Sequence, residues 1–204
     1  MNPYIQALLG RIPALQSCAD DIERVFEMMM TCYDSGGKVL ICGNGGSAAD
    51  AEHWTGELMK AFEKSRPLSP ADRAKLPPVL AERLQGALPT IPLTGFMSLG
   101  SAYANDVDSA YAFAQMVWGL GRAGDILVGL TTSGNSGNIL HAFEAARARG
   151  MKTAALTGAS GGKAADITDA CIRVPADVTH IVQEYHVSVY HCISQMLEGA
   201  FFGA

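Results

Sequence analysis

Residues 38–57 have the sequence KVLICGNGGSAADAEHWTGE. Residues 38–42 predict a buried strand, and the glycine-rich turn 43–47 predicts the start of a helix. Such a turn directs backbone N–H groups and the positive end of a helix dipole at one spot, where a phosphate or a sugar hydroxyl binds. It matches neither the dinucleotide motif nor the P-loop. By itself it is equally compatible with a turn that binds nothing.

The helix that follows this turn carries two groups suited to acid/base chemistry. His53 and Glu57 are four residues apart, so they share one face of the helix. An imidazole and a carboxylate at this spacing can transfer protons or hold a metal ion.

The rest of the chain alternates strand-like and helical segments, which is typical of a parallel sheet covered by helices. We predict an α/β fold, a three-layer sandwich with a five-stranded parallel sheet flanked by helices. The predicted strands are 38–42, 90–94, 125–130, 152–157 and 170–174.

Long helical patterns occupy both ends of the chain. Apolar residues recur at helical spacing from Tyr4 to Tyr33, with a break near Pro13, which gives an N-terminal helical segment of about 1–35. The segment from Thr179 to Phe202 is also helical and more apolar than an exposed terminal helix. We expect both to lie in contacts between subunits.

Residues 66–89 form an apparent insertion. Within it, Ser69-Pro70-Ala71-Asp72 has an N-cap, a proline at the first helical position and a reciprocal acid, which predicts one or two short helices. This inserted helical excursion is either a lid over a site or a solvated surface segment. We predict that 1–204 otherwise form a single domain.

Composition excludes several classes of protein. The net charge of −5 argues against a nucleic-acid-binding surface, which needs clustered Lys and Arg. The five cysteines are scattered, so a disulfide framework is not expected. No segment has the pattern of a signal peptide or a membrane span, so we expect no membrane association and a cytoplasmic location.

A second polar turn follows the strand 125–130. Thr131, Thr132, Ser133 and Ser136 supply four hydroxyls just before a helix that we expect from Gly137. A helix cap needs only one hydroxyl, so this number favours phosphate binding. Turns at the carboxyl ends of neighbouring parallel strands are where such sheets bind ligands.

A third polar cluster lies in the C-terminal helix. Gln183, Glu184, His186 and His191 interrupt an otherwise apolar segment, although any one of them by itself could be structural. Gln183 and His191 are eight residues apart, about 12 Å along an ideal helix. They would meet at one ion only if both side chains extended toward each other or if subunits shared the site.

Several of these motifs occur together in one known order. They are Gly43-Asn44-Gly45-Gly46-Ser47, His53 with Glu57, Asn105-Asp106, Thr132-Ser133-Gly134-Asn135-Ser136, Leu156-Thr157-Gly158 with Gly161-Gly162, and Gln183-Glu184 with His186 and His191. In these motifs the chain, from about residue 4 to residue 200, resembles the phosphoheptose isomerases of the sugar isomerase (SIS) domain superfamily.

The resemblance implies the SIS fold and a set of site residues. It implies one Zn²⁺ per subunit, held by His53, Glu57, Gln183 and His191. It also implies homotetramers with active sites between subunits. The residues it implies for substrate binding are Asn44, Gly45, Gly46, Ser47, Glu57, Asn105, Asp106, Thr131, Thr132, Ser133, Ser136 and Gln183.

The implied reaction converts sedoheptulose 7-phosphate to D-glycero-D-manno-heptose 7-phosphate through a cis-enediol, the first step of nucleotide-activated heptose biosynthesis. This reaction needs a base that removes a carbon-bound proton and an acid that protonates the carbonyl oxygen. The resemblance implies that the catalytic residues are Glu57 as the base and His191 as the acid. A ligated carboxylate is a weaker base, so we expect coordination to loosen when substrate binds.

Two alternatives stay open at this stage. One is a non-catalytic SIS protein that binds a phosphosugar or the initiator protein DnaA, and the joint presence of His53, Glu57, Gln183 and His191 argues against it. The other is an isomerase of a different phosphosugar. Differences from the resembling family, such as Lys60-Ala61 where many members have arginine, concern the sugar end of the site.

Overall fold

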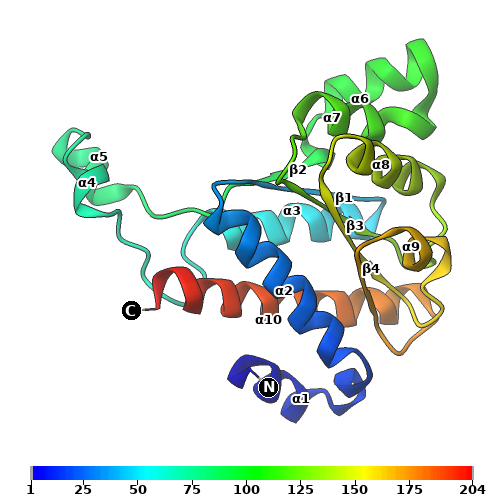
Figure 1. The fold of residues 1–204 in the computed structure, drawn as a ribbon, viewed down its shortest axis with the longest axis horizontal. Helices are drawn as coiled ribbons and strands as arrows, with labels where there is room; N and C mark the ends of the chain where they lie inside the picture. The colour runs from blue at the N-terminus through cyan, green and yellow to red at the C-terminus, as the bar shows by residue number, and fades with distance from the viewer. Residues whose placement is uncertain (1, 204) are drawn as a thin grey trace.

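The apolar runs expected to be strands form the centre of the molecule. The structure is a computed structural model that describes residues 2–203, in which five parallel strands form one sheet between two layers of helices (Figure 1). The predicted three-layer α/β sandwich is confirmed. The strands are β1 (Val39–Gly43), β2 (Thr90–Pro92), β3 (Ile126–Leu130), β4 (Lys152–Thr157) and β5 (Ala170–Arg173).

The observed strands agree closely with those expected, with two informative differences. The run 90–94 is shortened because Leu93 begins a 3-10 turn. Asp125 lies just before β3, where its carboxylate accepts hydrogen bonds from the backbone N–H groups of Lys38 and Arg122.

The order of the strands brings the two polar turns together. The order is β2-β1-β3-β4-β5, so the chain moves to one side of β1 for β2 and to the other side for β3. Open parallel sheets bind ligands at such a switch point, beyond the carboxyl ends of the strands. Gly43, the last residue of β1, pairs with Leu130, the last residue of β3. The turns 43–47 and 131–136 therefore begin side by side.

Alternate side chains of each strand enter two separate cores. In β1, Val39 and Ile41 belong to the core shared with the helices α1, α2, α3 and α10. Leu40 and Cys42 point to the other face and belong to the core shared with α7, α8 and α9. Because both faces are covered, all five residues of β1 are buried.

The helices and short turns complete the chain in the following order. They are α1 (Pro3–Arg11), η1 (Pro13–Cys18), α2 (Ala19–Asp34), α3 (Gly46–Met59), α4 (Pro70–Arg73), α5 (Pro78–Arg83), η2 (Leu93–Gly95), α6 (Met97–Tyr103), η3 (Ala104–Asp108), η4 (Ser109–Tyr111), α7 (Ala112–Leu120), α8 (Gly137–Ala148), α9 (Gly162–Ile167) and α10 (Thr179–Phe202).

The terminal helices form as expected. The N-terminal segment is broken after Ile12, because Pro13 opens a 3-10 turn between α1 and α2. Helix α10 covers the predicted range from Thr179 to Phe202. None of the helices within residues 2–203 is long and apolar enough to cross a membrane.

The excursion contains the two expected short helices, α4 and α5, which project from the rest of the chain (Figure 1). The Ser69 hydroxyl accepts from the N–H of Asp72 at 3.1 Å and donates to its carboxylate at 2.7 Å, so the predicted N-cap is confirmed. Neither helix lines the cavity between the polar turns. Within one chain, the excursion is therefore not a lid over that cavity.

Candidate active site

The two polar turns enclose a cavity of about 280 Å³ at the switch point. Both turns contribute to it, and the first two turns of α10 close it from one side. Its lining comprises Asn44, Gly45, Gly46, Ser47, Leu130, Thr131, Thr132, Ser136, Thr179 and Gln183. Of the residues implied for substrate binding, all four on the first turn and three on the second lie here.

A pair of amides ties the two turns to each other. The side-chain N–H of Asn44 donates to Asn138 at 3.0 Å, and that of Asn138 donates back to Asn44 at 2.8 Å. Asn138 lies in the first turn of α8, immediately after the hydroxyl-rich turn. The reciprocal pair ties the turn after β1 to the start of α8. Sequence reasoning assigned no role to Asn138.

The hydroxyl-rich turn presents donors at the start of α8. Ser136 occupies the N-cap position, yet its side chain does not cap the helix. It lies 3.1 Å from the Thr131 hydroxyl instead. The first N–H groups of α8 and these hydroxyls together suit a phosphate. Ser133 differs, because its exposed hydroxyl accepts from the N–H of Asn135 and does not line the cavity.

Gly134 is the residue that allows this turn to close. It has a φ of 67°, and a Cβ there would collide with the carbonyl oxygen of Gly161. The backbones of the two loops contact each other directly, since the N–H of Ala164 donates to the Gly134 carbonyl at 3.0 Å. The loop after β4 thus supports the turn after β3.

Helices α3 and α10 lie side by side and run in the same direction. Gln183 packs against Gly46 at the start of α3, where a Cβ would lie 2.6 Å from the Gln183 amide nitrogen. Further along, His191 of α10 contacts His53 of α3, with ring centroids 5.1 Å apart. The sequence-predicted residues are therefore divided between two places along these helices.

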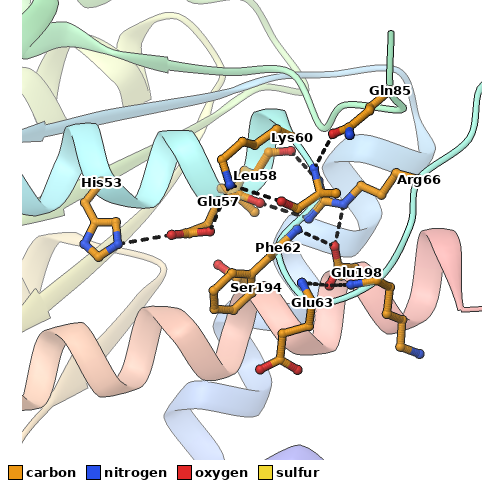
Figure 2. A network of polar contacts seen from close by, with 12 residues as sticks. His53, Glu57, Leu58, Lys60, Phe62, Glu63, Arg66, Gln85, Ser194 and Glu198 are labelled. Carbon is orange, nitrogen blue, oxygen red and sulfur yellow. Dashed lines mark hydrogen bonds and ion pairs between the residues drawn. The ribbon is translucent and has the colours of Figure 1, made fainter. Parts of the chain in front are cut away.

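His53, Glu57 and His191 form a compact cluster in the later turns of the two helices. One ligand atom from each lies within 4.8 Å of the other two. His53 Nε2 is 3.1 Å from Glu57 Oε1, and the side chains are 48% and 13% exposed. Figure 2 shows the His53 ring and the Glu57 carboxylate pointing toward each other along α3. The cluster is thus open on the His53 side and enclosed around Glu57.

Tyr190 and Asp50 hold the far side of the His53 ring. The Tyr190 hydroxyl lies 2.8 Å from His53 Nδ1 and 3.4 Å from Asp50 Oδ1. Burial raises the pKa of Tyr190, and Asp50 raises it further, so the phenol stays protonated. A hydrogen-bond partner at Nδ1 orients the ring and turns Nε2 toward Glu57, as the outer partners of metal-ligating histidines do.

The cluster fits a divalent metal ion. His53 Nε2 and Glu57 Oε1 face each other at 3.1 Å, and His191 offers a third ligand atom within 4.8 Å of both residues' ligand atoms. Glu57 Oε2 and His191 Nε2 are both buried without a hydrogen-bond partner among the described residues. Two imidazole nitrogens and one carboxylate oxygen are a ligand set that zinc uses in catalytic sites, with a position left for substrate.

His191 lies in a pocket that favours its neutral form. Burial lowers the pKa of His191, and the neighbouring His53 lowers it further, although Glu57 opposes the shift. The Phe62 ring packs on the other side of the imidazole, with centroids 5.4 Å apart. A neutral imidazole can donate a proton at one nitrogen and accept at the other.

Of the implied metal ligands only Gln183 lies outside the cluster, and Asn105 and Asp106, like Ser133, lie outside both the cluster and the cavity. Gln183 lines the cavity at the start of α3, about two helical turns from His53. Asn105 and Asp106 are exposed in the π-helical turn η3, where they hydrogen-bond each other at 2.8 Å. One chain therefore does not bring all the implied ligands and sugar-binding residues together.

Sequence reasoning missed the residues that support the cluster. Asp50 precedes His53 by three residues, which places it on the same face of the helix, and Tyr190 adjoins His191. These spacings were available signals. Phe62 gave no signal, because its contact with His191 depends on how the chain turns after α3.

Comparison with known proteins gives consistent results. The SIS domain profile matches residues 3–74 and 80–158. A phosphoheptose isomerase of Akkermansia muciniphila is 38% identical over 207 residues, covering 100% of both chains. The solved structure of phosphoheptose isomerase GmhA from Neisseria gonorrhoeae has a TM-score of 0.77 at 32% identity and covers 95% of this chain and 94% of its own. A Francisella tularensis phosphoheptose isomerase has a TM-score of 0.76 at 33% identity, covering 96% and 94%.

Proposed function

The chain belongs to the SIS domain family, and we propose that it is the aldose-ketose isomerase that converts sedoheptulose 7-phosphate to D-glycero-D-manno-heptose 7-phosphate. The observation that carries this assignment is the pairing of a hydroxyl-lined cavity with the cluster of His53, Glu57 and His191. The product would enter the synthesis of nucleotide-activated heptose.

The cavity supplies the binding half of the reaction. Thr131, Thr132 and Ser136 offer hydroxyls to the 7-phosphate, and the start of α8 adds backbone N–H groups. Charge-assisted hydrogen bonds of this kind are about twice as strong as neutral ones. The amide pair of Asn44 and Asn138 keeps the two turns at a fixed separation while the phosphate binds.

Glu57 and His191 supply the proton transfers. The Glu57 carboxylate takes a proton from C1 of the ketose, and His191 donates one to the carbonyl oxygen at C2, which gives the cis-enediol. His191 then accepts the proton from the oxygen on C1, and Glu57 returns its proton to C2. Glu57 Oε2 takes part in no hydrogen bond among the described residues and lies 3.9 Å from Lys60 Nζ, so it is the oxygen available to take the proton from carbon. Each group contributes on the order of 10²–10⁴-fold.

Zinc is the metal that this donor set suits best. His53, Glu57 and His191 would hold it, with Gln183 as a further ligand implied by the family resemblance. When bound, such an ion acts as a Lewis acid that polarises the sugar carbonyl. The carboxylate would serve both as ligand and as base, so its coordination would have to loosen when substrate binds.

In one chain the implied site residues lie in separate places, and an active site shared between subunits would account for this. The cluster lies about two helical turns from the Gln183 end of the cavity, and Asn105 and Asp106 lie outside it. A homotetramer, with the terminal helices at its contacts and 1–204 as one domain per subunit, would let neighbours complete each site. Residues 1 and 204 of the predicted domain lie outside the described structure. The cytoplasmic location is still a prediction.

The test is incubation of the purified protein with sedoheptulose 7-phosphate, followed by NMR detection of the aldoheptose phosphate before and after chelation. We expect turnover that chelation abolishes and added zinc restores. The Glu57→Gln variant is the control for a contaminating isomerase. Turnover of a shorter phosphosugar alone would assign a different substrate, and binding without turnover would favour a regulatory phosphosugar-binding protein.

Shared sites have their own test. We expect mixed oligomers of the Glu57→Gln and Ser136→Ala variants, assayed at a substrate concentration far below the raised KM of Ser136→Ala, to exceed the summed activity of the two variants assayed separately, because some sites would then contain two intact halves. No recovery after subunit exchange would place each complete site within one chain.

A further inference from the structure

A buried ion pair lies next to the catalytic cluster but takes no part in the proton transfers. Arg66, at the root of the excursion, contacts Glu198 of α10, with Nε 2.7 Å from Oε1 (Figure 2). The two side chains are 0% and 1% exposed. Burying charges costs free energy unless hydrogen bonds satisfy them. A pair that is almost completely buried is therefore expected to have a specific role.

The Arg66 guanidinium caps the end of α3. Its two terminal nitrogens donate to the carbonyls of Leu58 at 2.8 Å and Glu57 at 2.9 Å. Carbonyls in the last turn of a helix have no partner within the helix. The residue after α3, Lys60, is extended and does not form a glycine-type cap. A side chain from the irregular segment after α3 therefore fixes the backbone that carries the catalytic carboxylate.

The Glu198 carboxylate holds the segment that follows. It accepts from the N–H groups of Phe62 and Glu63 at 2.8 Å and of Lys64 at 2.9 Å. Phe62 is the residue whose ring packs on His191. Glu198 lies two turns beyond His191 on the same helix. The pair thus joins α3, the turn 62–64 and α10 at the level of the cluster.

We propose that Arg66 and Glu198 are positioning residues for the isomerase, which set the distance between Glu57 and His191 by fixing the end of α3 against α10. Apart from the bond that joins them, the hydrogen bonds of the pair go to the backbone of residues 57–64. This role rests on the proposed function, since it concerns the same two groups.

The molecule contains a matched control. Lys38 and Asp125 form a second, partly buried pair, 2.5 Å apart and 22% and 6% exposed, at the amino ends of β1 and β3. Asp125 also accepts backbone N–H groups, those of Lys38 and Arg122. This pair therefore resembles the first in chemistry but lies at the edge of the sheet opposite the cavity.

The experiment compares Arg66→Met/Glu198→Leu with Lys38→Met/Asp125→Leu, and both with Arg66→Lys. Replacement of a whole buried pair by apolar residues often leaves a protein folded, whereas removal of one partner does not. Melting temperature, zinc affinity by chelator competition, kcat and KM are measured for each. We expect the first double variant to lose about 10–100-fold in kcat and about tenfold or more in zinc affinity.

KM should change little in that variant, because the hydroxyl turn is built on β3 and α8. The Lys38/Asp125 variant should keep kcat and zinc affinity whatever its melting temperature. Arg66→Lys keeps the charge but not the forked contacts to both carbonyls, so it should lose about tenfold in kcat with little change in melting temperature.

Three outcomes would overturn the proposal. The first is a folded Arg66→Met/Glu198→Leu variant with native kcat and zinc affinity. The second is a Lys38→Met/Asp125→Leu control that loses as much kcat and zinc affinity as that variant. The third applies if the Arg66→Met/Glu198→Leu variant does not fold, and is an Arg66→Lys variant with native kcat and zinc affinity. Absence of turnover by the unaltered protein contradicts the isomerase assignment instead, and the zinc affinities then still test the positioning role.

Discussion

The turn after β1 and the turn after β3 start alike and lead to different chemistry. Each follows a buried parallel strand, opens a helix and lines the same cavity. In the proposed function, the turn 131–136 binds the phosphate with its own hydroxyls and the first N–H groups of α8, all within one helical turn. The turn 43–47 instead begins a helix whose reactive groups, His53 and Glu57, lie two to three turns later.

This difference predicts a division of labour. Substitutions on the β3 side should change KM, because they weaken the hold on the phosphate. Substitutions on the α3 side should change kcat or metal affinity, because they reach the cluster of His53, Glu57 and His191. The predictions below test this division, beginning with the largest expected effect.

Glu57→Gln should lower kcat by about 10²–10⁴-fold, because the amide keeps the size of the side chain but cannot accept the proton from carbon. KM should change by much less. Steady-state kinetics with sedoheptulose 7-phosphate provides the measurement. A variant with native kcat would remove Glu57 from the role of base and with it the α3 half of the comparison.

Thr131→Val and Ser136→Ala should each raise KM by about 10–100-fold, since each removes a hydroxyl that serves a charged phosphate. The kcat at saturation should stay within a few fold of the native value. The unphosphorylated sugar provides a control substrate. In both variants the KM for the 7-phosphate should move closer to the KM for the unphosphorylated sugar. An equal fall in kcat with native KM would contradict the division.

His186 is buried next to the end of β4, the strand beside β3. Its Nε2 donates to the carbonyl of Thr157, the last residue of β4, at 3.3 Å. Burial lowers the pKa of His186 to about 4 from 6.5, so the unfolded chain binds its proton first. Stability is therefore full above about pH 6.5 and falls as the pH drops toward 4, by about 2 kcal/mol at pH 5.

Urea unfolding of the native protein and of His186→Gln, measured between pH 7 and pH 4, checks this expectation. The glutamine retains a donor but does not titrate, so the difference between the two proteins should shrink as the pH falls. If the two proteins differ in unfolding free energy by the same amount at every pH, His186 is not the group that makes the native protein less stable in acid.

Tyr190→Phe should lower zinc affinity by about tenfold, at the lower end of the range for residues that orient a metal ligand. The ring keeps its stacking on Trp54, at 5.5 Å between centroids, but loses the hydroxyl between His53 and Asp50. Chelator competition gives the affinity, and phosphate binding should not change. Unaltered zinc affinity would mean that the hydroxyl does not orient His53.

The fold was largely predictable because its signals are local. Each strand is a short apolar run between turn residues, and both faces of the sheet are covered, so strands such as β4 appear in the sequence almost residue for residue. Ser69 and Pro13 likewise mark helix boundaries by rules that need only their neighbours. The run 90–94 was overextended because apolar character cannot distinguish a strand end from the 3-10 turn at Leu93.

The sequence by itself determined the two polar turns, the pair of His53 and Glu57 and the family resemblance, because spacing along a strand or helix fixes which residues share a face. Only the tertiary structure brought His191 to that pair and placed Gln183 against Gly46 at the start of α3, since this depends on α3 and α10 lying side by side. It alone joined Arg66 to Glu198, which are separated by 132 residues. Contacts between distant segments follow from packing, and no local pattern records them.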